Sequence, residues 1–305
     1  MKPLTSFGFY GGKARLSGLI SSMLDYGCET YLEPFGGSAA VLLNKQPHDR
    51  EICGETSVGL YCFWRIMSES ETFERLIERL YDTSYNFEEF QGYRRSLNGF
   101  EEIRNEDTRK ILCLKPNDQL NAAVSTFVVF TQSRDNAGEH WSDNRFASHE
   151  SYLTNIDRLA DVADRFNGVQ VVYTPKDKLF PGNAGTLPGA VLLQDARNNF
   201  YFDPPYIAEA GKEKDCDKPG SYYRYDWGIE EHRDFLRKIR RAEAKVLVSN
   251  YDDVNHLYAR YLEHGEGFAP SEMNRFSPWE RIEVEAKSTV ARGDRGRVEC
   301  FWRNY

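Results

Sequence analysis

Short apolar runs alternate with longer amphipathic stretches along most of the chain. The stretch from Ala14 to Leu24 places apolar residues three and four positions apart, which predicts a helix. Strands that alternate with helices predict an α/β fold in which a mainly parallel sheet is covered by helices on both faces. The runs with the length and composition of buried strands are 29–32, 51–54, 169–173, 200–202 and 245–249.

One long segment interrupts this alternation. Between the second and third predicted strands, residues 58–168 are mostly helical in pattern and heavily charged. Within this segment Ala122 to Thr131 is apolar enough to be buried, and Tyr152 to Phe166 again has a helical pattern. A polar, aromatic loop over 132–145 separates the two, and loops of this length inside a compact chain are usually functional or disordered.

The carboxyl-terminal part returns to the alternation of strands and helices. A helix is predicted from Glu230 to Ala242, followed by the strand 245–249, a further helix and two terminal strands. We therefore predict one domain made of residues 1–57 and 169–305, with a mostly helical domain inserted at 58–168.

Asp203-Pro204-Pro205-Tyr206 carries the clearest candidate chemistry. It follows the apolar run 200–202, so we expect it at the carboxyl end of a strand, the edge where open α/β sheets bind ligands. Two consecutive prolines fix φ and remove two backbone donors, which leaves a rigid turn rich in acceptors. The Asp203 carboxylate and the Pro204 carbonyl suit the two hydrogens of an amino group, and Tyr206 suits stacking on a flat ring. The alternative is a turn that only ends a strand.

Two glycine-containing motifs lie upstream. The first runs from Phe7 to Lys13 and includes Phe9 and Gly12. In the second, an apolar strand ends at Glu33 and a Gly-rich turn opens a helix, which is the layout of nucleotide-binding strand–turn–helix units. Glu55 follows about 20 residues after that turn, where an acidic residue is expected to contact a ribose hydroxyl. The alternative for Glu55 is an exposed residue beside a helix N-cap.

In this order, the motifs resemble those of the D12-class (Dam-type, α group) DNA N6-adenine methyltransferases. The catalytic motif of that family stands unaltered at 203–206, Val246 to Tyr251 resembles the strand and Ser-Asn turn that follow, and 297–305 resembles the closing strand. The resemblance implies a Rossmann-like methyltransferase sheet flanked by helices, S-adenosylmethionine as cofactor and double-stranded DNA as partner. Asp203, Pro204 and Tyr206 are then the catalytic residues.

The resemblance also assigns roles on the cofactor side. Phe9 and Lys13 are expected at the adenine and carboxylate ends of the cofactor, Glu55 at the ribose, and Asp177 near the cofactor adenine. The full set of cofactor-binding residues that it implies is Phe9, Tyr10, Gly12, Lys13, Glu33, Pro34, Phe35, Gly37, Ser38, Glu55, Asp177 and Asp203.

On the DNA side, the inserted segment 58–168 resembles the family's target-recognition domain. A base inside a duplex is out of reach, so we expect the adenine to be flipped out. Arg and Asn side chains can form two hydrogen bonds with a purine edge, so the Arg and Asn candidates in the 132–145 loop are expected to contact bases or phosphates. The alternative is that they are polar loop residues that face water. The aromatic loop 221–227 either lines the base pocket or packs on the core. The candidate DNA-binding residues are Arg134, Asn136, Tyr222, Arg292, Arg295 and Arg297.

The chain departs from the family pattern at two places. Ala39 stands where the cofactor loop of the family has its second glycine, which adds a methyl group near the ligand. The loop over 132–146 lacks the Arg-Tyr-Asn…Gly-x-Phe-Asn-x-Pro pattern associated with members that read GATC. We therefore do not predict GATC as the target, and the resemblance leaves open whether the enzyme serves restriction–modification, a mobile element or housekeeping.

Composition changes this picture in a few respects. The formal net charge of −8 argues mildly against a nucleic-acid partner, because phosphate contacts need Lys and Arg. The six cysteines and six histidines show no spacing typical of a metal site, so we expect no metal. No apolar stretch approaches the roughly 18 residues of a membrane span and no signal peptide is evident, which predicts a cytoplasmic protein. We expect a monomer, with a dimer as the alternative.

Three other functions remain open at this stage. The Asp-Pro-Pro-Tyr chemistry suits any amine conjugated to a ring, so methylation of N4 of cytosine in DNA is the first alternative. Methylation of structured RNA or of a protein amide is the second, although relatives that act on protein amides typically carry Asn at the position of Asp203. A DNA-binding protein with an inactive site is the third, and the intact motif and Lys13 argue against it.

Overall fold

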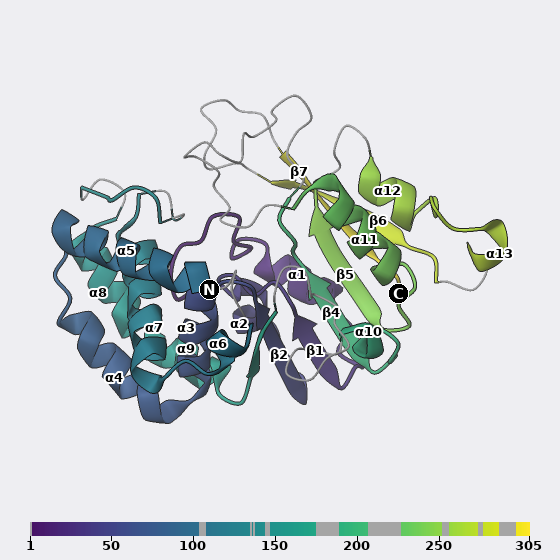
Figure 1. Ribbon diagram of the computed structural model, residues 1–305. Coiled ribbons are helices and arrows are strands. Elements are labelled where there is room, and N and C mark those ends of the chain that lie inside the picture. The colour runs from purple at the N-terminus through teal and green to yellow at the C-terminus, as the bar shows by residue number, and fades with distance from the viewer. Residues whose placement is uncertain are drawn as a thin grey trace. The chain divides into compact units, whose positions relative to one another are not determined.

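The structure is a computed structural model of the 305-residue chain. It describes residues 2–103, 108–134, 136, 138–143, 147–174, 189–206, 227–251, 256–273, 277–286 and 297–305. The described strands are β1 (Thr30–Glu33), β2 (Arg50–Glu55), β3 (Gln170–Tyr173), β4 (Asn198–Phe202), β5 (Lys245–Asn250), β6 (Glu280–Ala286) and β7 (Arg297–Arg303) (Figure 1). All five strands predicted from the apolar runs are present, each with ends close to those expected.

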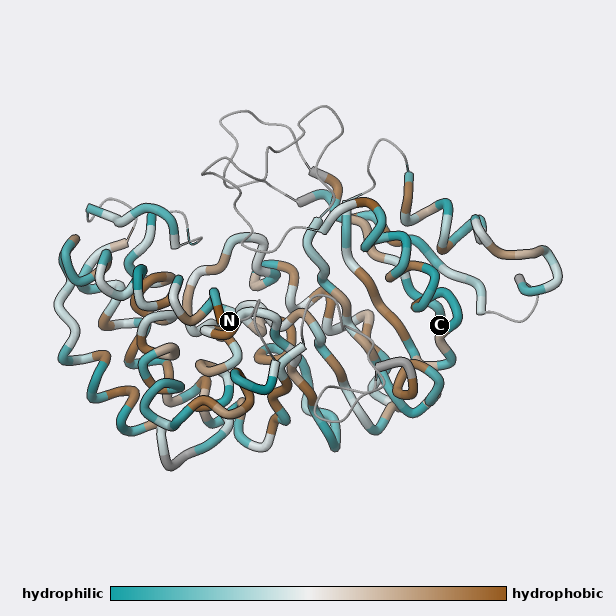
Figure 2. Tube along the Cα trace, viewed as in Figure 1, coloured by the Kyte–Doolittle hydropathy of each residue, from teal (hydrophilic) through white to brown (hydrophobic). Residues whose placement is uncertain are grey.

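These strands belong to one seven-stranded sheet with the order β3-β2-β1-β4-β5-β7-β6. The pairs β2–β3, β1–β4 and β4–β5 are parallel, whereas β5–β7 and β6–β7 are antiparallel. Every residue of β1 and β4 is buried, as expected for parallel strands with both faces covered. Figure 2 shows β5 in the hydrophobic colour along most of its length. The predicted α/β class with a mainly parallel sheet is confirmed.

The chain divides into two compact units. The first unit contains residues 1–23 and 33–187, and the second contains residues 24–32 and 188–305. The helices between β2 and β3 fall in the same unit as those two strands. The separate target-recognition domain at 58–168 therefore stays a prediction.

The first unit is built around two buried helices. α7 contacts α3, α4, α5 and α8 (Figure 1), and it is buried from Ala122 to Gln132, which confirms the burial predicted for this stretch. Aromatic rings fill the space between the helices, with Phe63 5.3 Å from Phe7 and 6.2 Å from Phe127. The helices of this unit are α1 (Ser17–Met23), α2 (Ala40–Asn44), α3 (Val58–Ser68), α4 (Ser70–Tyr81), α5 (Phe87–Ile103), α6 (Thr108–Leu112), α7 (Pro116–Gln132), α8 (His149–Asp157) and α9 (Leu159–Phe166).

Local capping explains where several helices begin. The Ser57 side chain accepts the N–H of Leu60 at the start of α3, and Ser148 and Ser151 form a capping box at the start of α8. Two predicted helices differ from the structure. The helix expected from Ala14 begins at Ser17, and the single helix expected over Tyr152–Phe166 is two helices that meet at Arg158.

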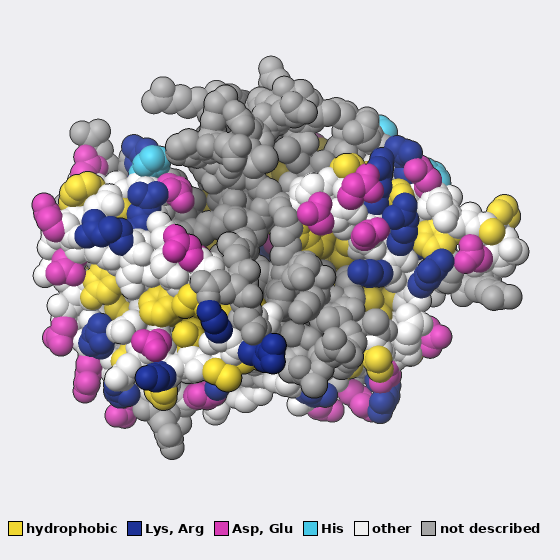
Figure 3. All heavy atoms as spheres, viewed as in Figure 1, with side chains coloured by type: hydrophobic (Ala, Val, Ile, Leu, Met, Phe, Trp, Pro, Cys, Tyr) yellow, Lys and Arg dark blue, Asp and Glu magenta, His cyan; other side chains and the backbone are white. Residues whose placement is uncertain are grey.

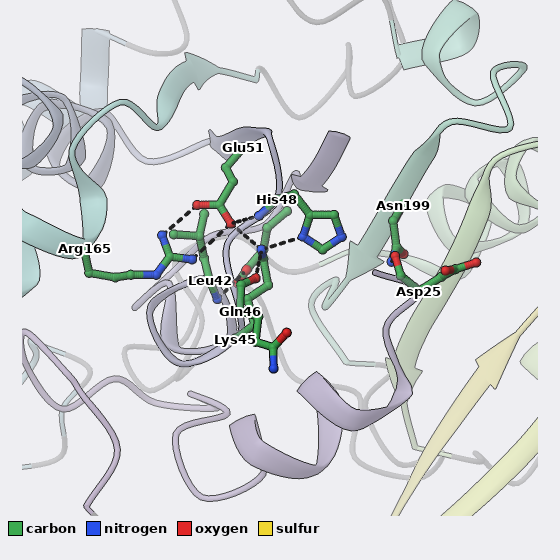
Figure 4. Close-up of polar contacts among 9 residues, drawn as sticks. Asp25, Leu42, Lys45, Gln46, His48, Glu51, Arg165 and Asn199 are labelled. Atoms are coloured by element: carbon green, nitrogen blue, oxygen red, sulfur yellow. Dashed lines mark hydrogen bonds and ion pairs between the residues drawn. The ribbon is translucent and has the colours of Figure 1, made fainter. Parts of the chain in front are cut away.

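A buried ion cluster joins α2, β2 and α9. Arg165 donates two hydrogen bonds to the Glu51 carboxylate, at 2.6 and 3.0 Å, and Lys45 pairs with the same carboxylate. Figure 4 shows Arg165 and Lys45 turned toward Glu51. The Lys45 Nζ also donates to the Gln46 carbonyl at 2.9 Å and lies 2.9 Å from the Nδ1 of His48. Because Glu51 lies near the start of β2 and Lys45 follows α2, the cluster ties the end of α2 to the start of β2.

The second unit surrounds β4, β5 and β7 with aromatic side chains. Phe235 of α11 meets Phe202 of β4 edge to face at 5.1 Å, and Tyr258 of α12 packs on Trp302 of β7 at 5.2 Å. These contacts hold the carboxyl end of β4 against the helices. The helices of this unit are α10 (Gly189–Leu192), α11 (Ile229–Ile239), α12 (Leu257–Leu262) and α13 (Pro270–Met273).

Candidate functional site

In the first unit, the glycine-rich loop follows β1 and opens α2. Gly37 has φ of 53°, a left-handed conformation that favours glycine, and Ala39 has φ of 49°. A Cβ at Gly36 would lie 2.5 Å from the Cys53 Sγ and 2.9 Å from the Glu55 Oε1, so only glycine fits there. The methyl group of Ala39 is fully buried, where it stands beside the first turn of α2.

The buried Glu33 carboxylate stabilises the end of this loop, where α2 begins. Ala39 is the N-cap of α2 and has no side chain that can accept a hydrogen bond. The Glu33 Oε2 instead accepts the backbone N–H of Leu42 at 3.0 Å, and the carboxylate is 3% exposed. A buried carboxylate at a helix N-terminus is stabilised by the helix dipole as well as by the hydrogen bond. Glu33 therefore anchors the start of α2, and a contact with a cofactor stays a prediction.

Glu55 ends β2 beside the same loop. It is 4% exposed, so the alternative of an exposed residue is wrong. Burial raises the pKa of its carboxyl well above the usual range, Glu101 and Glu33 raise it further, and hydrogen bonds from the backbone of Gly37 and Thr56 oppose the rise. No described residue makes a hydrogen bond to the Oε1 of Glu55. That oxygen can accept a hydrogen from a bound ligand.

The amino-terminal motif packs against the glycine-rich loop. Phe9 lies against Gly37, where an added Cβ would come within 3.0 Å of its ring, and it contacts Phe130 with ring centroids 5.3 Å apart. A Cβ at Gly12 would lie 3.2 Å from the Oγ of Ser38. The structure thus brings together two motifs that are about 25 residues apart and leaves space for no side chain at their contacts.

Lys13 and Tyr10 occupy defined places in this motif. Lys13 is 8% exposed and its Nζ donates to the Gly11 carbonyl at 2.9 Å, which turns the ammonium back toward the loop. The backbone N–H of Tyr10 donates to the carbonyl of Asn136 at 3.2 Å. A buried ammonium beside backbone carbonyls is suited to an anionic group on a ligand.

The loop after α7 contacts the amino-terminal motif. Asn136 has φ of 54°, and its side chain lies against Gly8. Arg134 is exposed, and its backbone N–H donates to the His140 carbonyl at 2.8 Å. Asn136 therefore uses its backbone and side chain on residues 8–10 of its own unit. DNA contacts of Arg134 and Asn136 stay predictions.

In the second unit, Asp203 follows directly after β4, as predicted. The Ser249 hydroxyl donates to the Asp203 Oδ1 at 2.8 Å, and the Tyr201 hydroxyl lies 3.0 Å from the Ser249 Oγ. β4 and β5 are parallel neighbours in which Phe202 pairs with Val248, so the next residue of each strand lies at the same carboxyl edge. Tyr201 and Ser249 are fully buried or nearly so and hold the Asp203 carboxylate in one orientation.

Tyr206 ends the candidate catalytic motif, and its side chain contacts Glu299 and Tyr251. Its hydroxyl donates to the Oε1 of Glu299 in β7, and its ring meets Tyr251 edge to face with centroids 4.5 Å apart. Burial raises the pKa of Tyr206 well above its usual range, and the nearby Asp203 and Glu299 carboxylates raise it further. The phenol therefore keeps its proton at neutral pH and donates a hydrogen bond to Glu299.

A comparison with protein families identifies the chain. The family model of the D12 class N6 adenine-specific DNA methyltransferases matches residues 9–174, which is more than half of the chain. The chain belongs to this family. This D12 methyltransferase is an adenine-specific DNA methyltransferase, which confirms the resemblance seen in its motifs and favours adenine over the cytosine alternative. No curated protein matches the chain.

Several residues that the sequence singled out lie outside the described residues of the D12 methyltransferase. They are Asp177, Tyr222, Arg292 and Arg295, together with the side chain of Arg297, whose backbone opens β7. From the aromatic loop 221–227 the structure describes Trp227, which packs on His232 and Phe235 at 5.2 and 5.4 Å. The rest of this loop lies outside the described residues, so its place at a base pocket stays a prediction.

Sequence reasoning missed some of the residues that support the site. Glu101 of α5 accepts the backbone N–H groups of Val58 and Gly59, at 3.1 and 3.0 Å, and so caps α3 from 42 or more residues away. Tyr201 and Glu299 lie next to or within the sequence motifs, but no local pattern links either of them to Asp203 or Tyr206. In the described part of the chain, no cluster of three or more His, Cys, Asp or Glu suits a metal ion, and no helix is long and apolar enough to cross a membrane.

Proposed function

We propose that this enzyme transfers the methyl group of S-adenosylmethionine to N6 of an adenine flipped out of duplex DNA. The observation that carries the proposal is the Asp203 carboxylate at the carboxyl end of β4, oriented by the Ser249 hydroxyl at 2.8 Å. Family membership supplies the target base, and the two motif sets supply the groups that the reaction needs.

The first unit fits the cofactor. The Glu55 Oε1 has no hydrogen-bond partner among the described residues and is suited to a ribose hydroxyl. Gly36 and Gly37 have no side chains, so a ligand can approach the backbone of this loop closely, with the Phe9 ring beside it. Lys13 suits the carboxylate of the methionine part. When bound, S-adenosylmethionine supplies a methyl group on a sulfonium, which needs no metal for activation.

The second unit supplies the groups that act on the base. The exocyclic amine of adenine is a poor nucleophile because its lone pair is delocalised into the ring. Asp203 and the Pro204 carbonyl accept hydrogen bonds from its two hydrogens, which localises the lone pair on the nitrogen and directs it toward the methyl group. The Asp203 carboxylate also stabilises the positive charge that develops on the nitrogen. Tyr206 stacks on the flipped ring and holds the amine in place.

DNA as the partner is compatible with the acidic composition. On the face shown in Figure 3, described Lys and Arg side chains lie interspersed with Asp and Glu side chains. Binding then depends on a few local contacts to phosphate and bases rather than on the net charge of −8. The monomeric state, the cytoplasmic location and the contacts of Arg134, Asn136 and the terminal arginines stay predictions.

The test is transfer of labelled methyl from S-adenosylmethionine to unmethylated duplex DNA, with mass spectrometry of the nucleosides. We expect N6-methyladenine with the wild type and none with Asp203→Ala. Asp234→Ala, an exposed Asp in α11, is the matched control and keeps full activity. N4-methylcytosine would overturn the target base, and a preference for single-stranded DNA would overturn the duplex substrate. A 2-aminopurine at the target position reports base flipping by fluorescence.

A further inference from the structure

We propose that Glu299 is a positioning residue for the target base, because it fixes the plane of the Tyr206 ring. This inference deepens the proposed function and rests on it, since Tyr206 is the residue assigned to stack on the flipped adenine. Glu299 acts here through the tyrosine hydroxyl, from which it accepts a hydrogen bond.

The Tyr206 ring has little freedom of its own. Pro204 and Pro205 precede it and fix the backbone, so the ring moves mainly by rotation of its own side chain. The Glu299 Oε1 accepts the hydroxyl at one end of the ring, and the Tyr251 ring meets it edge to face at an interplanar angle of 88°. Two contacts in different directions determine where the ring plane lies.

Glu299 is rigid enough to act as this anchor. It lies within β7, which is hydrogen-bonded to β5 on one side and to β6 on the other. In these ladders its neighbour Cys300 pairs with Asn250, next to Tyr251, and Glu299 itself pairs with Val284. The residue is 5% exposed. A carboxylate this buried needs hydrogen-bond donors, and the Tyr206 hydroxyl is one of them.

The expected consequence is a loss of positioning rather than of binding. A ring free to rotate stacks on the base in several planes, and small misplacements of a reacting group slow catalysis strongly. A hydrogen bond to a charged acceptor is stronger than one to a neutral acceptor. Glu299→Gln keeps the shape and an acceptor oxygen but removes the charge, so it should act more mildly than Glu299→Ala.

A double-mutant cycle separates positioning through Tyr206 from a general structural role. We expect Glu299→Ala to lower the single-turnover rate of methyl transfer about tenfold, and Glu299→Gln about threefold, with DNA and S-adenosylmethionine affinities changed less than threefold. Tyr206→Phe should lower the rate by a factor close to that of Glu299→Ala. Adding Glu299→Ala to Tyr206→Phe should then lower it by less than twofold more, because the hydroxyl is already absent.

The matched control is Glu283→Gln, a Glu on the neighbouring strand β6 with an exposed side chain that pairs with Arg281, and it should leave the rate unchanged. Thermal melting of every variant confirms that it folds. If Glu299→Ala does not fold, Glu299→Gln replaces it in the double-mutant cycle. Multiplicative losses in the double variant, or full activity of folded Glu299→Gln and Glu299→Ala, would overturn the role of Glu299. A wild type that produces no N6-methyladenine would instead overturn the proposed function.

Discussion

Glu51→Gln tests whether the buried ion cluster stabilises the first unit. The side chains of Lys45, Glu51 and Arg165 are 0%, 7% and 16% exposed, and both cations bind the one carboxylate. Glutamine has the same shape without the charge, so the substitution leaves two cations facing each other in the interior. Removing one partner of a buried ion pair destabilises a protein by about 3–5 kcal/mol, because it leaves a charge buried without compensation.

The pKa of Lys45 shows what burial of this cation costs even when Glu51 is present. Burial lowers it from 10.5 to about 8, although Glu51 opposes the fall. A fall of this size corresponds to about 3 kcal/mol of cost for keeping the lysine charged in the folded state. Without Glu51 the pKa falls further, so the folded variant releases the proton of Lys45 at a lower pH than the wild type does.

The direction of the pH dependence follows from this shift. Between the folded and the unfolded pKa of Lys45, the unfolded chain binds more protons, so stability rises with pH. For the wild type this contribution is gained between about pH 8 and pH 10.5. In Glu51→Gln the rise begins at lower pH, because the folded-state pKa is lower. The free energy of unfolding of the variant should therefore approach that of the wild type as pH increases from 7 to 9.

Urea unfolding followed by tryptophan fluorescence and circular dichroism measures the effect. We expect Glu51→Gln to lose about 3 kcal/mol at pH 7 and the added Lys45→Met to restore part of it, since an apolar chain replaces a buried ammonium that has lost its carboxylate. Glu29→Gln, at the exposed pair with Arg197, is the matched control and should have no measurable effect. A loss in Glu51→Gln no larger than in the control, or one that grows from pH 7 to 9, would refute the reasoning.

Three further predictions concern the reaction. Gly36→Ala should abolish S-adenosylmethionine binding in calorimetry, because the added Cβ meets Cys53 and Glu55. The control Gly18→Ala, whose added Cβ has nothing within 4 Å, should bind the cofactor normally, and equal affinities of the two variants for the cofactor would contradict this. Glu55→Gln should raise the dissociation constant for S-adenosylmethionine about tenfold, because an amide has one acceptor oxygen where the carboxyl has two, and an unchanged constant would remove the ribose role. Ser249→Ala should lower kcat about tenfold with KM for DNA nearly constant, and a change confined to KM would count against orientation of Asp203.

The sequence was sufficient for the strands and for the motifs that follow them. Val246 to Val248 are apolar and mostly β-branched, and the chemistry stands directly after each run, as at Asp203, so local pattern determines both element and place. Helix ends were predicted less well. Arg158 separates α8 from α9 without a glycine or proline to mark the break.

Contacts between distant residues were beyond sequence reasoning. Arg165 and Glu51 are 114 residues apart, and Tyr206 and Glu299 are 93 apart. Nothing in the residue types nearby indicates which carboxylate each of them meets, because that depends on how β2, α9 and β7 pack. The sequence located the candidate reacting groups, and the structure was needed to find the residues that contact them.

Several of the acidic residues are buried at the site, where their carboxyl groups accept hydrogen bonds. Glu33 accepts from the backbone of α2, Glu55 from the backbone of Gly37, and Glu299 from Tyr206, and all three carboxyls are at most 5% exposed. Loops rich in glycine and proline have few backbone hydrogen bonds of their own, so buried carboxylates supply the acceptors that fix them. Part of the acidic composition thus lies inside the enzyme as a support for its site, and Glu55, whose pKa is raised by burial, adds less negative charge than the formal count assumes. The net charge of −8 is for this reason a weak argument against a DNA substrate, and the local placement of cations decides the affinity.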